Sequence, residues 1–107
     1  MQQKQSSLDI KVQVDASNSK IVNIHINGDL SFATVPLAYE QTKSYFDERK
    51  SIQVDLNNVY KADSAAMALV LEWHRLAKKN DAEIILLNVP LILKNIASVT
   101  DLNILLS

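Results

Sequence analysis

Apolar and polar side chains alternate at the start of this chain, and this two-residue period constrains the fold more than any other feature. Between Leu8 and Val14 every second residue is Leu, Ile or Val, and the residues between them are Asp, Lys or Gln. Strands with one buried face show this pattern, because successive side chains point to opposite sides. Residues 15–20 are turn formers, and a β-branched run resumes over residues 21–26. The pattern predicts a hairpin whose second strand ends at Gly28.

From Val35 onward the apolar spacing becomes that of a helix, in which residues three and four apart share one face. The expected elements are a helix from Val35 to Phe46, a strand over 51–56, a loop over 57–62, a helix from Asp63 to Asn80, a strand over 83–87 and a helix from Pro90 to about Val99. Within the strand over 83–87, the residues after Glu83 are apolar at consecutive positions, which is typical of a strand covered on both faces. Residues 102–106 form either an edge strand or a closing helical turn. This order predicts an α/β fold with a mixed sheet of four or five strands and helices packed on it.

The length, charge and composition of the chain limit the number of domains and the kinds of partner that we expect. Its 107 residues suit one domain, which we expect over residues 8–107 after a flexible tail at 1–7. A formal net charge of -1 disfavours nucleic-acid binding, and the absence of cysteine fits a reducing compartment such as the cytosol. The first residues lack the apolar core of a secretory signal, and the longest apolar run has seven residues where a membrane span needs about 20. Any membrane association is therefore expected to be indirect, through a partner.

The chain offers little for catalysis or for holding a cofactor. Asp63, Ser64 and His74 supply the residue types of a hydrolase triad, but Ser64 and His74 lie ten helical residues apart, roughly 15 Å. Neither His74 nor His25 has a neighbouring ligand at metal-binding spacing. A phosphate-binding loop needs several glycines, and Gly28 is the only one in the chain. We expect a non-enzymatic protein without a cofactor or metal.

The helix beginning after Asp63 has more apolar side chains than packing on a sheet requires. One apolar stripe suffices for packing, and Ala66, Leu69, Val70, Trp73, Leu76 and Ala77 provide it. Met67, Ala68 and Leu71 are additional. They form either a contact surface for a partner or a second part of the core, covered by the C-terminal helix. Asp63 and Ser64 also have two interpretations, as a helix cap with an adjacent hydroxyl or as a regulatory site.

The segments 54–59 (VDLNNV) and 62–69 (ADSAAMAL) resemble the core motif of STAS domains, the family of anti-sigma factor antagonists. The resemblance extends from about Leu8 to Leu106 and implies a mixed sheet with helices on it. Within the family, the stretches 71–79 and 87–90 are most similar to the small STAS subunit of bacterial phospholipid-transport ABC complexes. In antagonist members a kinase phosphorylates the serine after the motif aspartate. In the transporter subunits a hydroxyl residue at that position contacts the ATPase subunit. Ser64 is the matching position here.

The resemblance implies a partner-binding surface at the start of this helix. Its residues are Asp63, Ser64, Ala65, Ala66, Met67, Leu71 and Arg75. Family members often carry glycine just after the hydroxyl residue, whereas this chain has Ala65 and Ala66, which stiffen the helix start. Stiffening disfavours a kinase substrate and favours a rigid docking surface. We therefore expect a cytoplasmic subunit that binds and regulates or stabilises the ATPase of a phospholipid transporter maintaining lipid asymmetry, held at the inner face of the inner membrane by that partner. The alternative is an anti-sigma factor antagonist that binds a kinase and is switched by phosphorylation of Ser64.

Overall fold

Every strand and helix expected from the apolar spacing is present, with some changed ends, in the computed structural model, which describes residues 7–46 and 50–106. The elements are β1 (Leu8–Val14), β2 (Ile21–Leu30), α1 (Val35–Thr42), η1 (Lys43–Tyr45), β3 (Ser51–Ala62), α2 (Ser64–Lys79), β4 (Glu83–Leu87), α3 (Leu91–Val99) and η2 (Asn103–Leu106), where η marks a short 3-10 helix. Most of the expected flexible tail lies outside the described residues. Its last residue, Ser7, is held in place, because its backbone oxygen accepts a hydrogen bond from the Asp29 amide at 2.8 Å.

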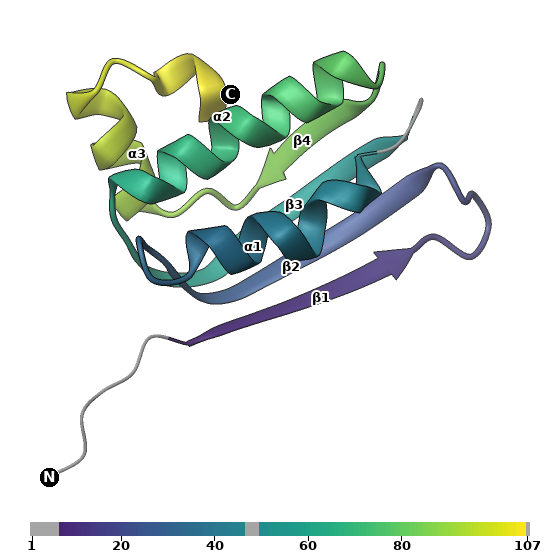
Figure 1. Ribbon diagram of the computed structural model, residues 1–107, viewed down its shortest axis with the longest axis horizontal. Helices are drawn as coiled ribbons and strands as arrows, with labels where there is room; N and C mark the ends of the chain where they lie inside the picture. The colour runs from purple at the N-terminus through teal and green to yellow at the C-terminus, as the bar shows by residue number, and fades with distance from the viewer. Residues whose placement is uncertain (1–6, 47–49, 107) are drawn as a thin grey trace, which may run out of the picture.

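The sheet is mixed, and its strands lie in chain order, β1-β2-β3-β4. β1 pairs antiparallel with β2, whereas β2 with β3 and β3 with β4 are parallel. Both parallel connections step in the same direction across the sheet, so right-handed crossovers place α1 and α2 on the same face. Figure 1 shows the two helices side by side over that face. This architecture confirms the predicted α/β fold class.

The covered face of the sheet and the inner sides of the helices form one core. Alternate side chains of β2 and β3 point into it, as the two-residue period predicts, and α2 contributes Trp73. The indole Nε1 of Trp73 donates a hydrogen bond to the buried Thr42 Oγ1 at 2.9 Å, and this hydroxyl in turn donates to the Ala38 oxygen at 2.7 Å. These buried bonds join the end of α1 to the middle of α2. Core packing against the sheet and the hydrogen bond to α1 together fix the position of α2.

The other face of the sheet is not covered by any described element. Predicting β4 as a strand covered on both faces was therefore wrong: Ile85 and Leu87 are 36% and 37% exposed on the uncovered face, while Ile84 and Leu86 turn toward the helices. β4 is also an edge strand, paired only with β3 among the described strands. A run of four apolar residues, 84–87, is compatible with a strand covered on one face as well as with a fully buried strand.

Two strands extend further than predicted, because each contains an irregularity that turn-forming residues occupy. β2 continues past Gly28 to Leu30, and the pairing with β3 shifts register beside this glycine. Gly28 has φ 115°, and a Cβ there would collide with the backbone oxygen of Ser7. β3 continues through the expected loop over 57–62, with a second register shift between His25 and Asn27 of β2. The longer β3 carries the chain directly to the start of α2, and the longer β2 ends beside it, since Leu30 pairs with Ala62.

The C-terminal part of the chain packs beside α2 on the side away from α1 (Figure 1). Residues 103–106 form the 3-10 helix η2, which decides between the two alternatives for this segment in favour of a helical turn. The Nε2 atom of His74 on α2 lies 2.8 Å from the backbone oxygen of Leu105 and joins η2 to α2. None of the helices in the described parts of the chain is both long and apolar enough to cross a membrane.

Candidate docking site at the start of α2

Asp63 fixes the start of α2 through both oxygens of its carboxylate. Its backbone is extended, and its Oδ1 accepts a hydrogen bond from the Ala65 amide at 2.8 Å, as expected of an N-cap residue. Its Oδ2 accepts a second bond from the Phe32 amide at 3.0 Å. Phe32 belongs to the loop between β2 and α1, so one side chain joins two segments 31 residues apart. The predicted cap is confirmed, and it also positions this neighbouring loop.

One exposed ridge runs along α2 on the side opposite the core. Ser64, Ala68, Leu71 and Arg75 are spaced three or four residues apart and therefore share one face of the helix. Ser64, Ala68 and Arg75 are exposed, and Leu71 is half-buried. We call these four residues the α2 ridge. The small side chains of its first turns leave the helix backbone open to close approach by a partner.

The structure divides the seven residues predicted to bind a partner into surface and core. Ala66 has no exposed area and Met67 is 2% exposed, and both belong to the core cluster that also contains Leu93 and Ala97 of α3. Including Ala66 and Met67 in the contact surface was wrong, because α3 packs against α2 on the side where Met67 lies. The half-buried residues Asp63, Ala65 and Leu71 and the exposed residues Ser64 and Arg75 remain available at the surface.

A groove lies between the start of α2 and the outer side of α3. Its volume is about 460 Å³, and its lining is mostly apolar. The residues that line it are Ala62, Asp63, Ser64, Asn95, Ile96, Val99 and Thr100. Val99 is 88% exposed at its rim. We call this the α2–α3 groove; it is a surface into which an apolar side chain of a partner fits beside Ser64.

A second apolar groove borders the ridge on its other side. It has a volume of about 330 Å³ and lies between α1 and α2. The residues that line it are Val35, Pro36, Tyr39, Ala68, Leu69 and Glu72. Ala68 belongs both to the α2 ridge and to this groove. The ridge is therefore flanked on both sides by apolar grooves. Side chains of a bound protein could pack into these grooves on either side of the ridge.

Three surface residues near this site were not predicted as contacts. Ala68 was recognised only as an additional apolar residue, and Phe32 and Val99 were not singled out. Phe32 is 79% exposed in the loop that Asp63 holds. The sequence does contain a signal for Val99, since α3 has more apolar residues than one buried stripe needs. A single aromatic residue in a loop, such as Phe32, carries no comparable signal.

The charged residues of this region lie at its edges. Arg75 and Glu72 form an ion pair on α2, with Nη1 and Oε1 2.8 Å apart. Lys43 of η1 pairs with Glu40 of α1 at 2.9 Å, and the hydrogen bond that Lys43 donates to the Glu40 carboxylate raises the pKa of Lys43 above its ordinary value. Both pairs are exposed, so they contribute little to stability. Between Ser64 and Leu71 the α2 ridge carries no charged side chain, and the Asp63 carboxylate beside it is bonded to two backbone amides.

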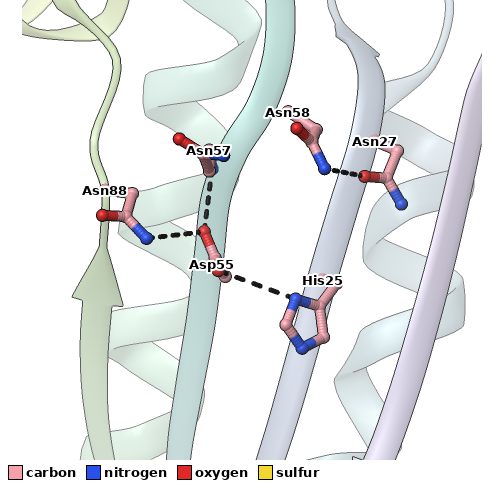
Figure 2. Close-up of polar contacts among 6 residues, drawn as sticks. All are labelled: His25, Asn27, Asp55, Asn57, Asn58 and Asn88. Atoms are coloured by element: carbon pink, nitrogen blue, oxygen red, sulfur yellow. Dashed lines mark hydrogen bonds and ion pairs between the residues drawn. The ribbon is translucent and has the colours of Figure 1, made fainter.

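A polar cluster on the uncovered face of the sheet supports the position of α3 (Figure 2). Asp55 of β3 accepts hydrogen bonds at Oδ1 from the Asn57 amide at 2.9 Å and from Asn88 Nδ2 at 3.1 Å. Asn88 lies between β4 and α3, and its φ of 54° falls in the left-handed region where the chain turns. His25 of β2 approaches Asp55 at 3.7 Å, too far for a hydrogen bond. The cluster thus fixes the turn that leads into α3 and the α2–α3 groove.

The structure keeps the residue types of the hydrolase triad apart, and it brings no metal-ligating group together in the parts of the chain that it describes. The side chains of Ser64 and His74 lie ten residues apart on α2, and His74 is engaged with Leu105. Within residues 7–46 and 50–106, no three His, Cys, Asp or Glu side chains come together in a way that could hold a metal ion. The features that the site does contain are a rigid helix start, an exposed ridge and two apolar grooves.

The fold and site define a small α/β domain with a mixed sheet, helices on one face and a capped helix presented to solvent. The sequence model of a protein family described as "Mlab, STAS domain" matches residues 12–107. The chain therefore belongs to the STAS-domain family. Members of this family are in general regulatory or binding domains, not enzymes, and they interact with partner proteins. No curated protein sequence matches the chain significantly.

Solved structures confirm the fold. The anti-sigma factor antagonist SpoIIAA in its unphosphorylated form superposes with a TM-score of 0.68 at 18% identity, over 91% of this chain and 86% of that one. The phosphorylated form, from Bacillus, gives 0.64 at 18% identity, over 91% and 89%. A Thermotoga maritima protein described as an anti-sigma factor antagonist gives 0.73 at 15% identity, over 92% and 83%. At these identities the likeness establishes the fold alone.

Proposed function

We propose that this domain is the non-enzymatic STAS subunit of a bacterial ABC-type phospholipid transporter, where it binds and regulates or stabilises the ATPase subunit. The observation that carries the proposal is the α2 ridge, a rigid and largely neutral surface between two apolar grooves. Its location would be cytoplasmic, at the inner face of the inner membrane, through the partner. The process served would be the maintenance of lipid asymmetry.

The start of α2 supports an ATPase over a kinase as the partner. Ala65 and Ala66 both lie within the helix, and the Ala65 amide is bonded to Asp63. A kinase must bring the Ser64 hydroxyl to its phosphate donor, which is easier when the chain around the serine is extended. A helix held this firmly is better suited to dock as a preformed surface. The family model whose description names Mlab agrees with this choice.

A second function, that of an anti-sigma factor antagonist, is favoured by one observation. Ser64 is exposed at the first position of α2, where a kinase could reach its hydroxyl. A phosphate there would add up to two negative charges beside Asp63 in a neutral surface. In this alternative, phosphorylation of Ser64 would switch off binding to the kinase that carries it out.

Co-expression distinguishes the two functions. The tagged domain would be produced together with the ATPase subunit of the ABC phospholipid transporter and the sigma-regulating kinases from the same genome, and the proteins that bind it would be purified through the tag. We expect the ATPase to be recovered in stoichiometric amount, and its ATP hydrolysis rate or its thermal stability to change when the domain is present. Recovery of a sigma-regulating kinase in place of the ATPase would refute the transporter function.

Matched variants locate the contact in the same experiment. Ala68→Arg places a long cation on the α2 ridge and should abolish recovery of the ATPase. Gln13→Arg makes a comparable change on an exposed position of β1, on the uncovered face of the sheet, and should leave recovery unchanged. Equal losses in both variants would show that the ridge is not the contact.

A further inference from the structure

The exposed side of α2 changes from neutral to basic along its length. The first turns of the α2 ridge carry Ser64, Ala68 and Leu71, and the ridge then reaches Arg75, followed by the exposed Lys78 and Lys79. The helix thus carries three basic side chains and one acidic side chain, in a protein whose net charge is -1. Positive charge is concentrated at the end of the same helix that forms the docking surface.

One of these three positive charges is neutralised by a residue that the structure describes, and the other two are not. Glu72 is the acidic residue of α2, and its carboxylate is already bonded to Arg75 at 2.8 Å. In the described portion of the chain, Lys78 and Lys79 have no ion-pair partner. Lys43 of η1 is neutralised by Glu40 of the neighbouring α1. The basic end of α2 is therefore the part of this surface whose charge is available to a partner.

The apolar part of the surface lies at the opposite end of the helix. The α2–α3 groove is lined by Ser64 together with Ile96 and Val99. Eleven residues separate Ser64 from Arg75, which on an α-helix is about 16 Å. A partner that uses both parts must therefore carry an apolar side chain and acidic side chains at this separation.

We propose that the partner's contact surface is acidic where it faces Arg75, Lys78 and Lys79, and that an apolar side chain about 16 Å away enters the α2–α3 groove. This inference rests on the proposed function, because it describes the ATPase subunit's surface. The apolar contact supplies affinity at the centre, and the charged contact at the rim steers association and sets orientation. Binding of this kind weakens as salt increases, since exposed charges are screened.

Charge reversal tests the acidic surface directly. The probe is the purified ATPase subunit of the ABC phospholipid transporter from the same genome, with association rates and Kd measured at about 50 mM and about 500 mM salt. The double variant Lys78→Glu/Lys79→Glu should lower the association rate at low salt by about tenfold or more and lose most of its salt dependence. Lys11→Glu, at an exposed position of β1 on the uncovered face of the sheet, reverses a charge on the face opposite the helices and should stay within about twofold of the wild type.

A second variant separates binding from helix stability. Lys78 and Lys79 also lie in the last turn of α2, where positive charge stabilises a helix. The double variant Lys78→Met/Lys79→Met removes the positive charge without introducing repulsion. Its association rate should fall by a few-fold, less than that of the Glu double variant, and its circular dichroism spectrum should match that of the wild type. Reversal on the partner, from acidic to basic at the facing positions, should restore binding to the Glu double variant.

The outcomes distinguish this inference from the function on which it rests. If the wild-type domain does not bind the ATPase subunit, the proposed function fails and this inference fails with it. If the wild type binds but neither lysine variant changes the rate or its salt dependence, the function stands and the acidic surface is refuted. Tighter binding to phosphatidylglycerol vesicles than to the ATPase, lost in the same variants, would assign the basic end to the membrane and also refute the proposal.

Discussion

The Asp63 carboxylate accepts a hydrogen bond from the Phe32 amide at 3.0 Å, so the residue that starts α2 also holds the loop after β2. Because its other oxygen caps the helix at the Ala65 amide, the carboxylate holds the backbone of the exposed residue Phe32 close to the start of α2. The geometry of the docking site therefore depends on a side chain that itself is only partly exposed.

Replacing Asp63 by Ala should destabilise the domain and weaken docking together. The variant leaves the amides of Ala65 and Phe32 without their acceptor, which we expect to cost about 1–2 kcal/mol of the free energy of unfolding. Asp63→Asn keeps one amide oxygen and should give an intermediate loss. Urea unfolding of the wild type, Asp63→Ala and Asp63→Asn measures the free energy of unfolding of each protein. An alanine variant as stable as the wild type would show that the carboxylate contributes neither bond in solution.

Ser64→Glu should abolish partner binding with little effect on stability. Ser64 is exposed at the first helical position, where a carboxylate interacts favourably with the helix dipole, so we expect the free energy of unfolding to change by less than about 1 kcal/mol. The negative charge would, however, lie in the neutral centre of the docking site. Ser64→Ala is the matched control and should bind normally. Binding of the glutamate variant at wild-type strength would remove Ser64 from the interface.

Met67 and Ala68 are adjacent in sequence, yet they should respond in opposite ways. Met67→Ala opens a cavity in the core and should cost about 2–4 kcal/mol, with docking retained by the fraction that remains folded. Ala68→Arg should leave stability within about 0.5 kcal/mol and abolish docking. Thermal unfolding and a binding titration on both variants provide the comparison. A stability loss confined to the Ala68 variant would contradict the assignment of core and surface.

Asp55→Ala should loosen the turn into α3. The change removes the acceptor for Asn88 Nδ2 and for the Asn57 amide, and we expect a loss of about 1 kcal/mol with faster amide exchange around Asn88. His25→Ala is the control. Its 3.7 Å contact with Asp55 joins two partly exposed groups, so it should change stability by less than about 0.5 kcal/mol. Equal effects of both variants would assign the histidine a structural role that its geometry does not indicate.

The pKa of Asp15 should rise when Ser17 is replaced by Ala. Hydrogen bonds from the Ser17 hydroxyl, and then from the Ser17 and Asn18 amides, stabilise the charged carboxylate and lower its pKa below the ordinary value. The stabilisation is present at pH above the ordinary pKa of aspartate and is lost as pH falls through the lowered folded-state pKa. An NMR titration of the Asp15 carboxyl carbon measures the shift. An unchanged pKa in Ser17→Ala would show that the hydroxyl does not hold the charge.

Local sequence patterns predicted the elements because their causes are local. Alternation gives β1 and helical spacing gives α2, and the extended Asp63 before an apolar helix indicates the cap. The two extended strand ends were missed because Gly28 and Asn57 lie at irregularities that the neighbouring strand accommodates. Glycine and asparagine end a strand where the neighbouring strand does not continue beyond them to pair with the chain. Long-range pairing decides between these outcomes.

The docking site was predictable only in part for the same reason. Helical spacing places Ser64, Leu71 and Arg75 on one face, but it cannot tell whether Met67 is covered, since that depends on α3 packing against α2. The grooves are likewise formed between segments distant in sequence. Phe32 is placed by a hydrogen bond that spans 31 residues. The family resemblance indicated this helix start as the candidate site, and tertiary packing determined which of its residues reach the surface.

The core and the ridge of α2 consist of different residues, so the ridge side chains can be exchanged without altering the core. The interior of α2 is formed by residues that face the sheet and the flanking helices, whereas the ridge positions 64, 68, 71 and 75 carry little of the core. These four side chains can be copied as a group onto another STAS domain while its own interior stays unchanged. A graft of this kind measures how much of the partner choice comes from the ridge, because the two grooves beside it are completed by α1 and α3 of the recipient.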